Sequence, residues 1–415
     1  MVRCISSWGV FATVSDANAP QKRSALAANL ADTASGRPGS WHNGLMASAL
    51  FPTSVYLDRL RRVRSAMAEQ RVDVLLLSVG PDLPWLTGYQ AMPLERLTML
   101  VVPSDGNAVM VIPRLEAARV AEQPGVFSLQ TWNETDDPIE LVARLAGRAT
   151  NVAIGDHTWT RFLVDLLPAM PAATWRRGVE VTGPLRMAKD AVEIERLVAA
   201  GAAADRVAAQ LHSGDIALVG RTEADVSADI SARLIAEGHD KVNFAIVAAG
   251  ENAASPHHHA SSRVIRNGEV VLCDFGGTMA GYCSDITRCV SLGEPPSDVA
   301  AAYAVLHAAQ AAGVKAGTVG TPCEDVDAAS RRIIADAGYG EFFIHRTGHG
   351  IGMEEHEDPY IVSGNALPLA AGHAYSVEPG IYVPGKFGMR LEDIVVASAD
   401  GPMPLNHARH ELVIL

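Results

Sequence analysis

The sequence predicts an α+β protein with two folded domains. Its 415 residues exceed the size of one typical domain, and a hydrophobic content of 48% is enough for two cores. From about residue 56 to residue 184, helix-like and strand-like segments alternate, which is typical of an α/β domain. Beyond residue 185, two similar helices and several short strands that carry acids indicate a domain of another kind. We therefore expect domains at 52–184 and 185–415.

Residues 1–50 differ from the rest of the chain. They are rich in Ala, Ser, Asn and Gly with weak periodicity, so we expect a disordered extension. A signal peptide is the less favoured interpretation, because serines and a glycine interrupt the apolar stretch Ile5–Val14 that follows Arg3. A further hypothesis is that the protein begins at Met46.

The first domain is predicted from its periodicity. Tyr56–Glu69 has the pattern of an amphipathic helix, and Val72–Val79 that of a buried strand. Asp105-Gly106 between two apolar runs predicts a hairpin. The remaining expected elements are hairpin strands at Leu97–Pro103 and Ala108–Pro113, helices near Arg114–Glu122, Pro138–Ala146 and Arg161–Leu167, and a strand at Asn151–Ile154.

The second domain begins with a break and contains a faint repeat. Thr182-Gly183-Pro184 interrupts the pattern and precedes a predicted long helix over Asp190–Leu211. At an offset of one hundred residues, Thr222 and Thr321 each precede an acid by three residues, which is the pattern of a helix capping box. Both predicted helices end at a glycine. The repeat suggests two related halves.

An acidic hairpin stands out in the second domain. We expect a buried strand over Val270–Cys273 to run into Asp274, turn at Gly276-Gly277 and return over Met279–Ile286. Asp285 then lies near Asp274 across the ladder. Two acids on an otherwise apolar hairpin are unfavourable to bury unless a cation neutralises them. A metal ion is the natural partner.

Three later segments supply more ligands for a metal ion. Alternate glycines in Phe342–His356 argue against a helix and suggest extended chain around His349. Glu378 follows a short strand, and Glu392 precedes an apolar one. Oxygen-rich ligation with one imidazole suits manganese, cobalt or zinc, and four carboxylates would balance two divalent ions better than one. The expected metal ligands are Asp274, Asp285, His349, Glu378 and Glu392.

The order of these five side chains resembles the metal-ligand pattern of the pita-bread metallopeptidases. That family includes methionine aminopeptidase, aminopeptidase P and prolidase, with creatinase as a metal-free relative. The segments GYCSDITR, HRTGHGIGMEEHEDP, SVEPGIY and RLEDIVV look like its prolidase and aminopeptidase P branch. From about Tyr56 the chain is similar to actinobacterial Xaa-Pro dipeptidases. The resemblance implies a creatinase-like α/β N-terminal domain, then a pita-bread catalytic domain of two pseudo-related halves with a curved antiparallel sheet.

The resemblance also implies a reaction and roles for residues. It implies hydrolysis of Xaa-Pro dipeptides or short peptides by a hydroxide that bridges two divalent ions, manganese first, with cobalt or zinc as alternatives. Glu378 would shuttle the proton, and His257 and His356 would hold the carbonyl and the oxyanion. His345 maps onto a substrate-contacting or ligand-supporting position. Arg390 would either orient a ligand carboxylate or pair with the carboxylate of the substrate.

Two other activities remain open at this point. Aminopeptidase P activity on longer peptides would use the same ligands. Relatives also act on small molecules that are not peptides, such as creatine or ectoine.

Some neighbouring residues are given structural roles instead. Successive side chains of His257, His258 and His259 diverge, so we place His257 at the site and the other two at the surface. Trp85 lies in Asp82–Tyr89, a segment that also resembles the family, and we expect it in the core rather than against substrate.

Charge and cysteine usage narrow the partners and the compartment. A net charge of −13 argues against nucleic acid or an anionic membrane surface as a partner. No apolar run approaches the roughly 20 residues of a spanning helix. Five cysteines, without a CxxC pair, suit a reducing compartment, so we expect a cytoplasmic protein. The expected partners are a small peptide and a second copy of the chain in a homodimer.

Overall fold

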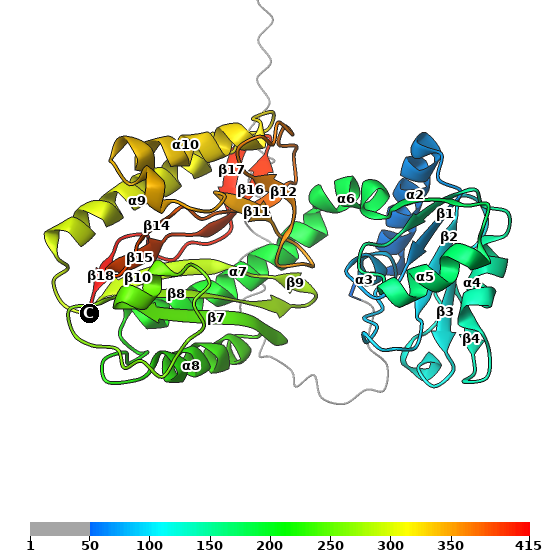
Figure 1. Ribbon diagram of the computed structural model, residues 1–415, viewed down its shortest axis with the longest axis horizontal. Coiled ribbons are helices and arrows are strands. Elements are labelled where there is room, and N and C mark those ends of the chain that lie inside the picture. The colour runs from blue at the N-terminus through cyan, green and yellow to red at the C-terminus, as the bar shows by residue number, and fades with distance from the viewer. Residues whose placement is uncertain (1–49) are drawn as a thin grey trace, which may run out of the picture. The chain divides into compact units, whose positions relative to one another are not determined.

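The structure, a computed structural model, describes residues 50–415. The predicted extension therefore lies outside the described residues except for Leu50, as do the hypotheses of a signal peptide and of a start at Met46. No helix in 50–415 is long and apolar enough to cross a membrane. An α/β part is followed by a part built on antiparallel strands, which confirms the predicted fold class (Figure 1).

The N-terminal part is built on a mixed sheet of six strands in the order β4-β3-β2-β1-β5-β6. The predicted hairpin around Asp105-Gly106 is confirmed, because β2 and β3 pair antiparallel. The strands are β1 (Val74–Leu77), β2 (Met99–Pro103), β3 (Val109–Pro113), β4 (Ser128–Trp132), β5 (Asn151–Ile154) and β6 (Thr174–Arg177). The α-helices are α2 (Thr53–Gln70), α3 (Asp82–Thr87), α4 (Pro138–Ala146), α5 (Thr160–Ala169) and α6 (Val179–Met187).

The predicted helix at Arg114–Glu122 is wrong. Only a short 3₁₀ turn forms there, over Ala117–Arg119. The backbone is already extended at Val120, with φ −135° and ψ 134°. A tight turn around Pro124-Gly125 then follows Gln123. Glu122 instead accepts a hydrogen bond from the backbone N–H of Leu129, at 2.7 Å.

The predicted break at Thr182-Gly183-Pro184 is also wrong, since helix α6 runs through it. Pro184 has no N–H to offer the carbonyl of Glu180, four residues earlier. The side-chain amide of Gln70 donates to that carbonyl instead, at 2.9 Å. A partner from another helix thus lets α6 keep an internal proline. The domain boundary after residue 184 stays a prediction.

The C-terminal part contains two five-stranded sheets and a two-stranded ribbon. One sheet has the order β18-β10-β8-β7, with β9 paired to β8, and the other has the order β12-β11-β13-β16-β17. Described pairings here are antiparallel except β10–β18. The strands of the first sheet are β7 (Lys241–Ala249), β8 (Val270–Met279), β9 (Tyr282–Cys283), β10 (Ile286–Ser291) and β18 (Val413–Ile414). Those of the second sheet and the ribbon are β11 (Gly348–Gly350), β12 (Glu357–Ile361), β13 (Ala374–Val377), β16 (Asp393–Ser398), β17 (Gly401–Pro404), β14 (Gly380–Val383) and β15 (Phe387–Arg390).

Four longer helices accompany these strands. They are α7 (Ala191–His212), α8 (Glu223–Ala236), α9 (Ser297–Ala316) and α10 (Cys323–Asp336). Figure 1 shows α8 beneath strands β7 and β8, and α9 with α10 on the far side of β14 and β15. An isolated bridge between Thr287 and Glu392 joins the two sheets. The strands therefore lie between the helices, and the bridge marks where the two halves meet.

The predicted repeat is confirmed for its helices, which are separated by the expected offset and are equally long. Both are followed by a glycine with positive φ, Gly238 at 111° and Gly338 at 85°. The capping box at Thr222 is present, because the hydroxyl of Thr222 accepts from the N–H of Asp225 and the Asp225 carboxylate accepts in return.

The capping box at Thr321 is wrong, since Pro322 is the residue that precedes helix α10. The first N–H groups of that helix are satisfied by another segment of the chain. Those of Cys323 and Glu324 donate to the carbonyls of Leu367 and Asn365, at 3.0 and 2.9 Å. Helix α8 has the same kind of contact, because the N–H groups of Glu223 and Ala224 donate to the carbonyls of Arg263 and Ser261, both at 3.0 Å. Loop carbonyls therefore bond both helix starts, and the second half lacks only the side-chain cap.

The predicted turn at Gly276-Gly277 is wrong as well. Strand β8 runs through both glycines to Met279, and the chain turns at Ala280-Gly281. A Cβ at Gly276 would lie 2.1 Å from the carbonyl oxygen of Ser284, so this glycine permits close approach of the backbones. Asp274 consequently lies inside the strand, opposite Thr287, and not at its end.

The two helix starts give a matched test of capping. Thr222→Ala should lower the free energy of unfolding by about 1 kcal/mol, because it removes a side-chain cap. Thr321→Ala should change it by less than about 0.5 kcal/mol, because the Thr321 hydroxyl contacts only that of Thr318 among the described residues. Urea denaturation of both variants measures the difference. Equal losses would contradict the assignment of the cap.

Candidate metal centre

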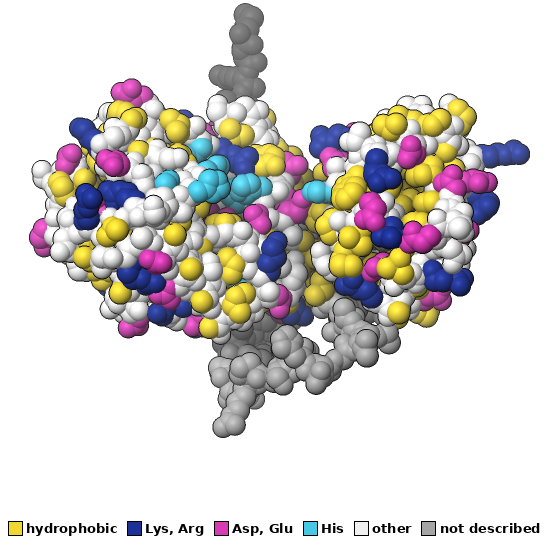
Figure 2. All heavy atoms as spheres, turned by 60° about the horizontal axis from the view of Figure 1, so that its bottom comes forward, with side chains coloured by type: hydrophobic (Ala, Val, Ile, Leu, Met, Phe, Trp, Pro, Cys, Tyr) yellow, Lys and Arg dark blue, Asp and Glu magenta, His cyan; other side chains and the backbone are white. Residues whose placement is uncertain are grey.

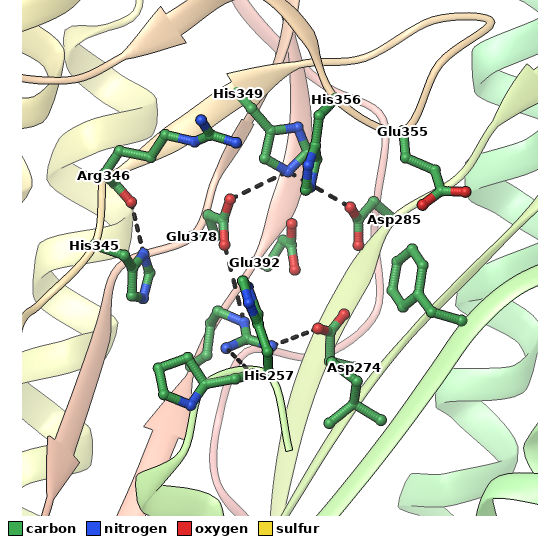
Figure 3. A pocket seen from close by; sticks show the side chains of 14 residues that line it. His257, Asp274, Asp285, His345, Arg346, His349, Glu355, His356, Glu378 and Glu392 are labelled. Atoms are coloured by element: carbon green, nitrogen blue, oxygen red, sulfur yellow. Dashed lines mark hydrogen bonds and ion pairs between the residues drawn. The ribbon is translucent and has the colours of Figure 1, made fainter. Parts of the chain in front are cut away.

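The five predicted ligands line one cavity of about 570 Å3 (Figure 3). Asp274 lies on β8, Asp285 just before β10, and His349 on β11. Glu378 follows β13, and Glu392 immediately precedes β16. The cavity is also lined by Phe244, Ile246, Pro256, His257, His345, Arg346, Glu355, His356 and Arg390. Figure 2 shows histidine side chains gathered on one face of the molecule.

Three of these side chains approach one another closely enough to share an ion. Ligand atoms of Asp285, His349 and Glu392 all lie within 4.8 Å of one another. The Nε2 atom of His349 is 3.2 Å from Glu378 Oε1 and 3.7 Å from Asp285 Oδ2. Its Nδ1 atom is 3.1 Å from the carbonyl of Gly350. Because Nδ1 faces that carbonyl, Nε2 is the nitrogen that faces the carboxylates.

Burial and mutual repulsion perturb the carboxylates. Burial, then the charges of Glu392 and Asp274, raises the pKa of Asp285 well above its usual range. Burial and the charge of Glu378 do the same to the pKa of Glu392. Burial also raises the pKa of Asp274, against the attraction of Arg390. Burial would raise the pKa of Glu378 too, but the hydrogen bond and charge of His349 hold it at about 2.

The residues present fit a divalent cation. Asp274 Oδ1 and Asp285 Oδ1 are buried and have no hydrogen-bond partner among the described residues. A buried carboxylate oxygen without a donor is unfavourable, and an ion would satisfy both atoms. Oxygen ligands with one imidazole are the set that borderline-hard divalent ions accept.

Arg390 and Thr287 hold the ligand carboxylates. The guanidinium of Arg390 donates from Nη2 to Asp274, from Nη1 to the Tyr382 hydroxyl at 2.8 Å, and from Nε to the Thr287 hydroxyl at 3.0 Å. The Thr287 hydroxyl donates in turn to Glu392, at 2.6 Å. These contacts fit the first alternative for Arg390, orientation of a ligand carboxylate.

The buried carboxylate of Glu223 holds the loop that carries His257 through hydrogen bonds. His257 is exposed at the cavity. The Glu223 carboxylate accepts from the N–H groups of Ala249 and Ser261, and lies 2.8 Å from Nε2 of His258. His258, with a side chain only 17% exposed, is therefore not the surface residue we predicted. His259 is exposed, as predicted.

His345 and His356 have different surroundings. His345 has a partner at each nitrogen, the carbonyl of Arg346 at 2.7 Å and the hydroxyl of Tyr382 at 2.8 Å. Within the described chain it therefore supports the cavity wall. The His356 ring lies 4.0 Å from that of His349. Burial, then the charges of His349 and Arg346, lowers the pKa of His356 to about 4, so its imidazole is neutral at pH 7.

Trp85 lies in the core, as predicted. It is fully buried, and its indole N–H donates to Glu193 at 3.0 Å.

Sequence reasoning missed several residues that line the cavity or support its walls. Thr287 and Ile246 both lie opposite Asp274 in the ladders of β10 and β7. Strand pairing would have found them, had the register been known. Tyr382 lies on the strand that follows Glu378, and Arg346 adjoins His345 in a segment that we did identify. Phe244 and Glu355 carried no separate signal.

Comparison with known proteins gives the family. Residues 195–399 match the model described as metallopeptidase family M24, and residues 59–187 match that of the Creatinase/Prolidase N-terminal domain. "Probable dipeptidase PepE" of Mycobacterium bovis is 44% identical over 89% of this chain and 99% of its own length. "Xaa-Pro dipeptidase" of Lactobacillus helveticus is 36% identical over 86% of this chain and 98% of its own length.

A solved structure agrees with this result. The crystal structure of dipeptidase PepE from Mycobacterium ulcerans has a TM-score of 0.83 and 44% identity, and the match covers 88% of this chain and 99% of that one. This chain therefore belongs to metallopeptidase family M24 and is a metal-dependent peptidase.

The repulsion among the carboxylates predicts how the metal-free protein responds to pH. A carboxyl group whose pKa is raised in the folded state stabilises that state at low pH and loses this effect as pH rises through its folded value. Protein stripped with chelator should therefore lose thermal stability as the pH rises above the ordinary carboxyl pKa of about 4. Asp285→Asn should raise the melting temperature at pH 8 by about 3 °C or more and flatten this decline.

Thermal unfolding monitored by circular dichroism in the presence of chelator measures this effect. Asp400→Asn, in an exposed turn, is the matched control and should leave the curve unchanged. A flat profile for the stripped wild-type protein would contradict the prediction.

Proposed function

We propose that this protein is a dinuclear metallopeptidase that hydrolyses Xaa-Pro dipeptides. The observation that carries the proposal is the convergence of four carboxylates and one imidazole in a single cavity. Its size lies within the roughly 300–1,000 Å3 of small-molecule sites. Relatives named dipeptidase and Xaa-Pro dipeptidase, which the chain matches over nearly their whole length, support the substrate class.

The five side chains divide between two divalent ions. Asp274, Asp285, His349, Glu378 and Glu392 would hold these ions, with Asp285 and Glu392 as the residues that both ions would share. The charge of two divalent ions balances that of four carboxylates. Asp274 and Asp285 each have one buried oxygen without a hydrogen-bond donor, which supports both residues as metal ligands. Manganese is the first expectation for the metal, with cobalt or zinc as alternatives.

When bound, the ions would supply a nucleophile from water at neutral pH and polarise the scissile carbonyl. Glu378 then moves a proton. Its Oε1 atom accepts from the Ser376 hydroxyl at 3.0 Å, which leaves Oε2 as the atom that accepts and returns the proton. An Xaa-Pro bond has a tertiary amide nitrogen without N–H, so that nitrogen must receive a proton to depart.

Two histidines complete the site. Neutral His356 donates an N–H to the oxyanion, which suits the position of its ring beside that of His349. His257, exposed on its fastened loop, contacts the substrate carbonyl.

We also propose a cytoplasmic homodimer. The four cysteines in the described chain are buried thiols, which suits a reducing compartment. The dimer follows from the family resemblance.

Two ligand variants test the assignment of the metal centre. Asp285→Asn and His349→Ala should each lower kcat/KM for Ala-Pro at least about 1,000-fold, because each removes a side chain that binds the metal directly. Circular dichroism should show folded protein, and elemental mass spectrometry should show less bound metal. Asp400→Asn serves again as the control. Normal turnover in either ligand variant would remove the two-metal assignment.

A substrate panel tests the reaction. Protein stripped by chelator should be inactive, and manganese should restore cleavage of Ala-Pro but not of Ala-Ala or Ala-Pro-Ala, as chromatography of the products would show. Cleavage of the tripeptide would indicate aminopeptidase P activity. Failure to cleave any of the three peptides, in protein that binds two ions, would indicate a substrate that is not a peptide.

A further inference from the structure

A dipeptide brings a carboxylate into a cavity already lined by acids. In an Xaa-Pro dipeptide this group lies one residue from the scissile bond, so it must enter the cavity together with that bond. A carboxylate that enters a cavity needs a cation or hydrogen-bond donors there, because burying it without a partner is unfavourable. Two arginines line the cavity, Arg346 and Arg390, and either has the donors to bind a carboxylate.

Arg390 is already engaged. Each of its three nitrogens donates within the site, to Asp274, Tyr382 and Thr287. It is only 3% exposed, so substrate could reach it only by displacing a carboxylate that it positions. The second alternative from the sequence, pairing of Arg390 with substrate, therefore conflicts with its contacts.

Arg346 is in the opposite state. It is half-buried, and its guanidinium carbon lies 4.3 Å from the centre of the Tyr360 ring. Within residues 50–415 its guanidinium forms no ion pair and no hydrogen bond. Figure 3 shows this side chain reaching over the cavity toward His349. Stacking on one face leaves the N–H edges of the guanidinium available.

The backbone on both sides of Arg346 is fixed from helix α10. Asp327 accepts from the N–H of Thr347 at 3.0 Å and from its hydroxyl at 2.8 Å. Arg331 donates to the carbonyl of His345 at 2.7 Å and to that of Phe343 at 3.0 Å. A side chain held at both flanks and stacked on an aromatic ring loses little entropy when it binds an anion.

We propose that Arg346 binds the C-terminal carboxylate of the substrate and thereby selects dipeptides over amidated or longer peptides. The inference rests on the proposed function. Its planar fork matches a carboxylate with two parallel N–H···O bonds. His345 does not replace it, because both of its ring nitrogens already have partners, the carbonyl of Arg346 and the hydroxyl of Tyr382. In a longer peptide the carboxylate lies further from the scissile bond and misses the guanidinium.

The test compares Ala-Pro with its C-terminal amide on metal-loaded protein. Arg346→Met should lower kcat/KM for Ala-Pro about 30- to 100-fold, mainly through KM, while that for the amide changes less than about threefold. Arg346→Lys, which keeps the charge without the fork, should fall between. Arg332→Met removes an exposed arginine of helix α10 and should leave kcat/KM for both substrates unchanged.

A second readout does not depend on turnover. Calorimetry should show that wild-type protein binds proline at least about tenfold more tightly than prolinamide, and that Arg346→Met loses this preference. An unchanged preference, or an equal loss for both peptides in the kinetic test, overturns the role of Arg346. Absence of all peptide cleavage in the wild-type protein would instead reject the proposed function, and calorimetry would still decide on Arg346.

Discussion

The repulsion among four carboxylates buried around one imidazole is the constraint on which this structure depends. Asp274 lies within a strand, and Asp285, Glu378 and Glu392 lie beside the ends of three others, so the fold brings them together. Burial strengthens the interaction among these carboxylates. Such a cluster is tolerable when cations neutralise it, and two of its oxygens are left without any donor. The fold therefore keeps the fixed charge of Arg390 on Asp274 and leaves the remaining negative charge for metal ions.

The strands that bring these acids together pack with their backbones unusually close to one another. A Cβ at Gly348 would lie 1.8 Å from the carbonyl oxygen of Ser376, so only glycine allows β11 to lie against β13 there. That approach lets one hydroxyl position two ligands. Ser376 accepts from the N–H of His349 and donates to Glu378, both at 3.0 Å. The glycines of the ligand segments thus serve the geometry of the site.

The two arginines of the cavity have different roles because their surroundings differ. Arg390 is buried and saturated with partners, so it positions the metal ligands. Arg346 is stacked, half-buried and anchored through its flanking backbone, so its charge is available to a substrate. Residue type alone does not distinguish these roles, and neither does position, since each lies within three residues of a ligand.

The sequence by itself determined the fold class, the hairpin at Asp105-Gly106, the repeated helices and the five residues that meet in the cavity. Periodicity and turn chemistry are local, and an acid on an apolar strand is unfavourable wherever the chain goes, so these signals are written in the sequence. The tertiary structure decided what depends on a distant partner. Gln70 bonds the carbonyl of Glu180 that Pro184 leaves without an N–H, and loop carbonyls bond the first N–H groups of helix α10, which has no Thr321 cap. Close backbone approach makes Gly276 part of a strand. Hydrogen bonds to Asp274, Tyr382 and Thr287 occupy the guanidinium of Arg390, so it is not available to substrate. Each outcome depends on a contact between residues far apart in the chain, which local pattern does not contain.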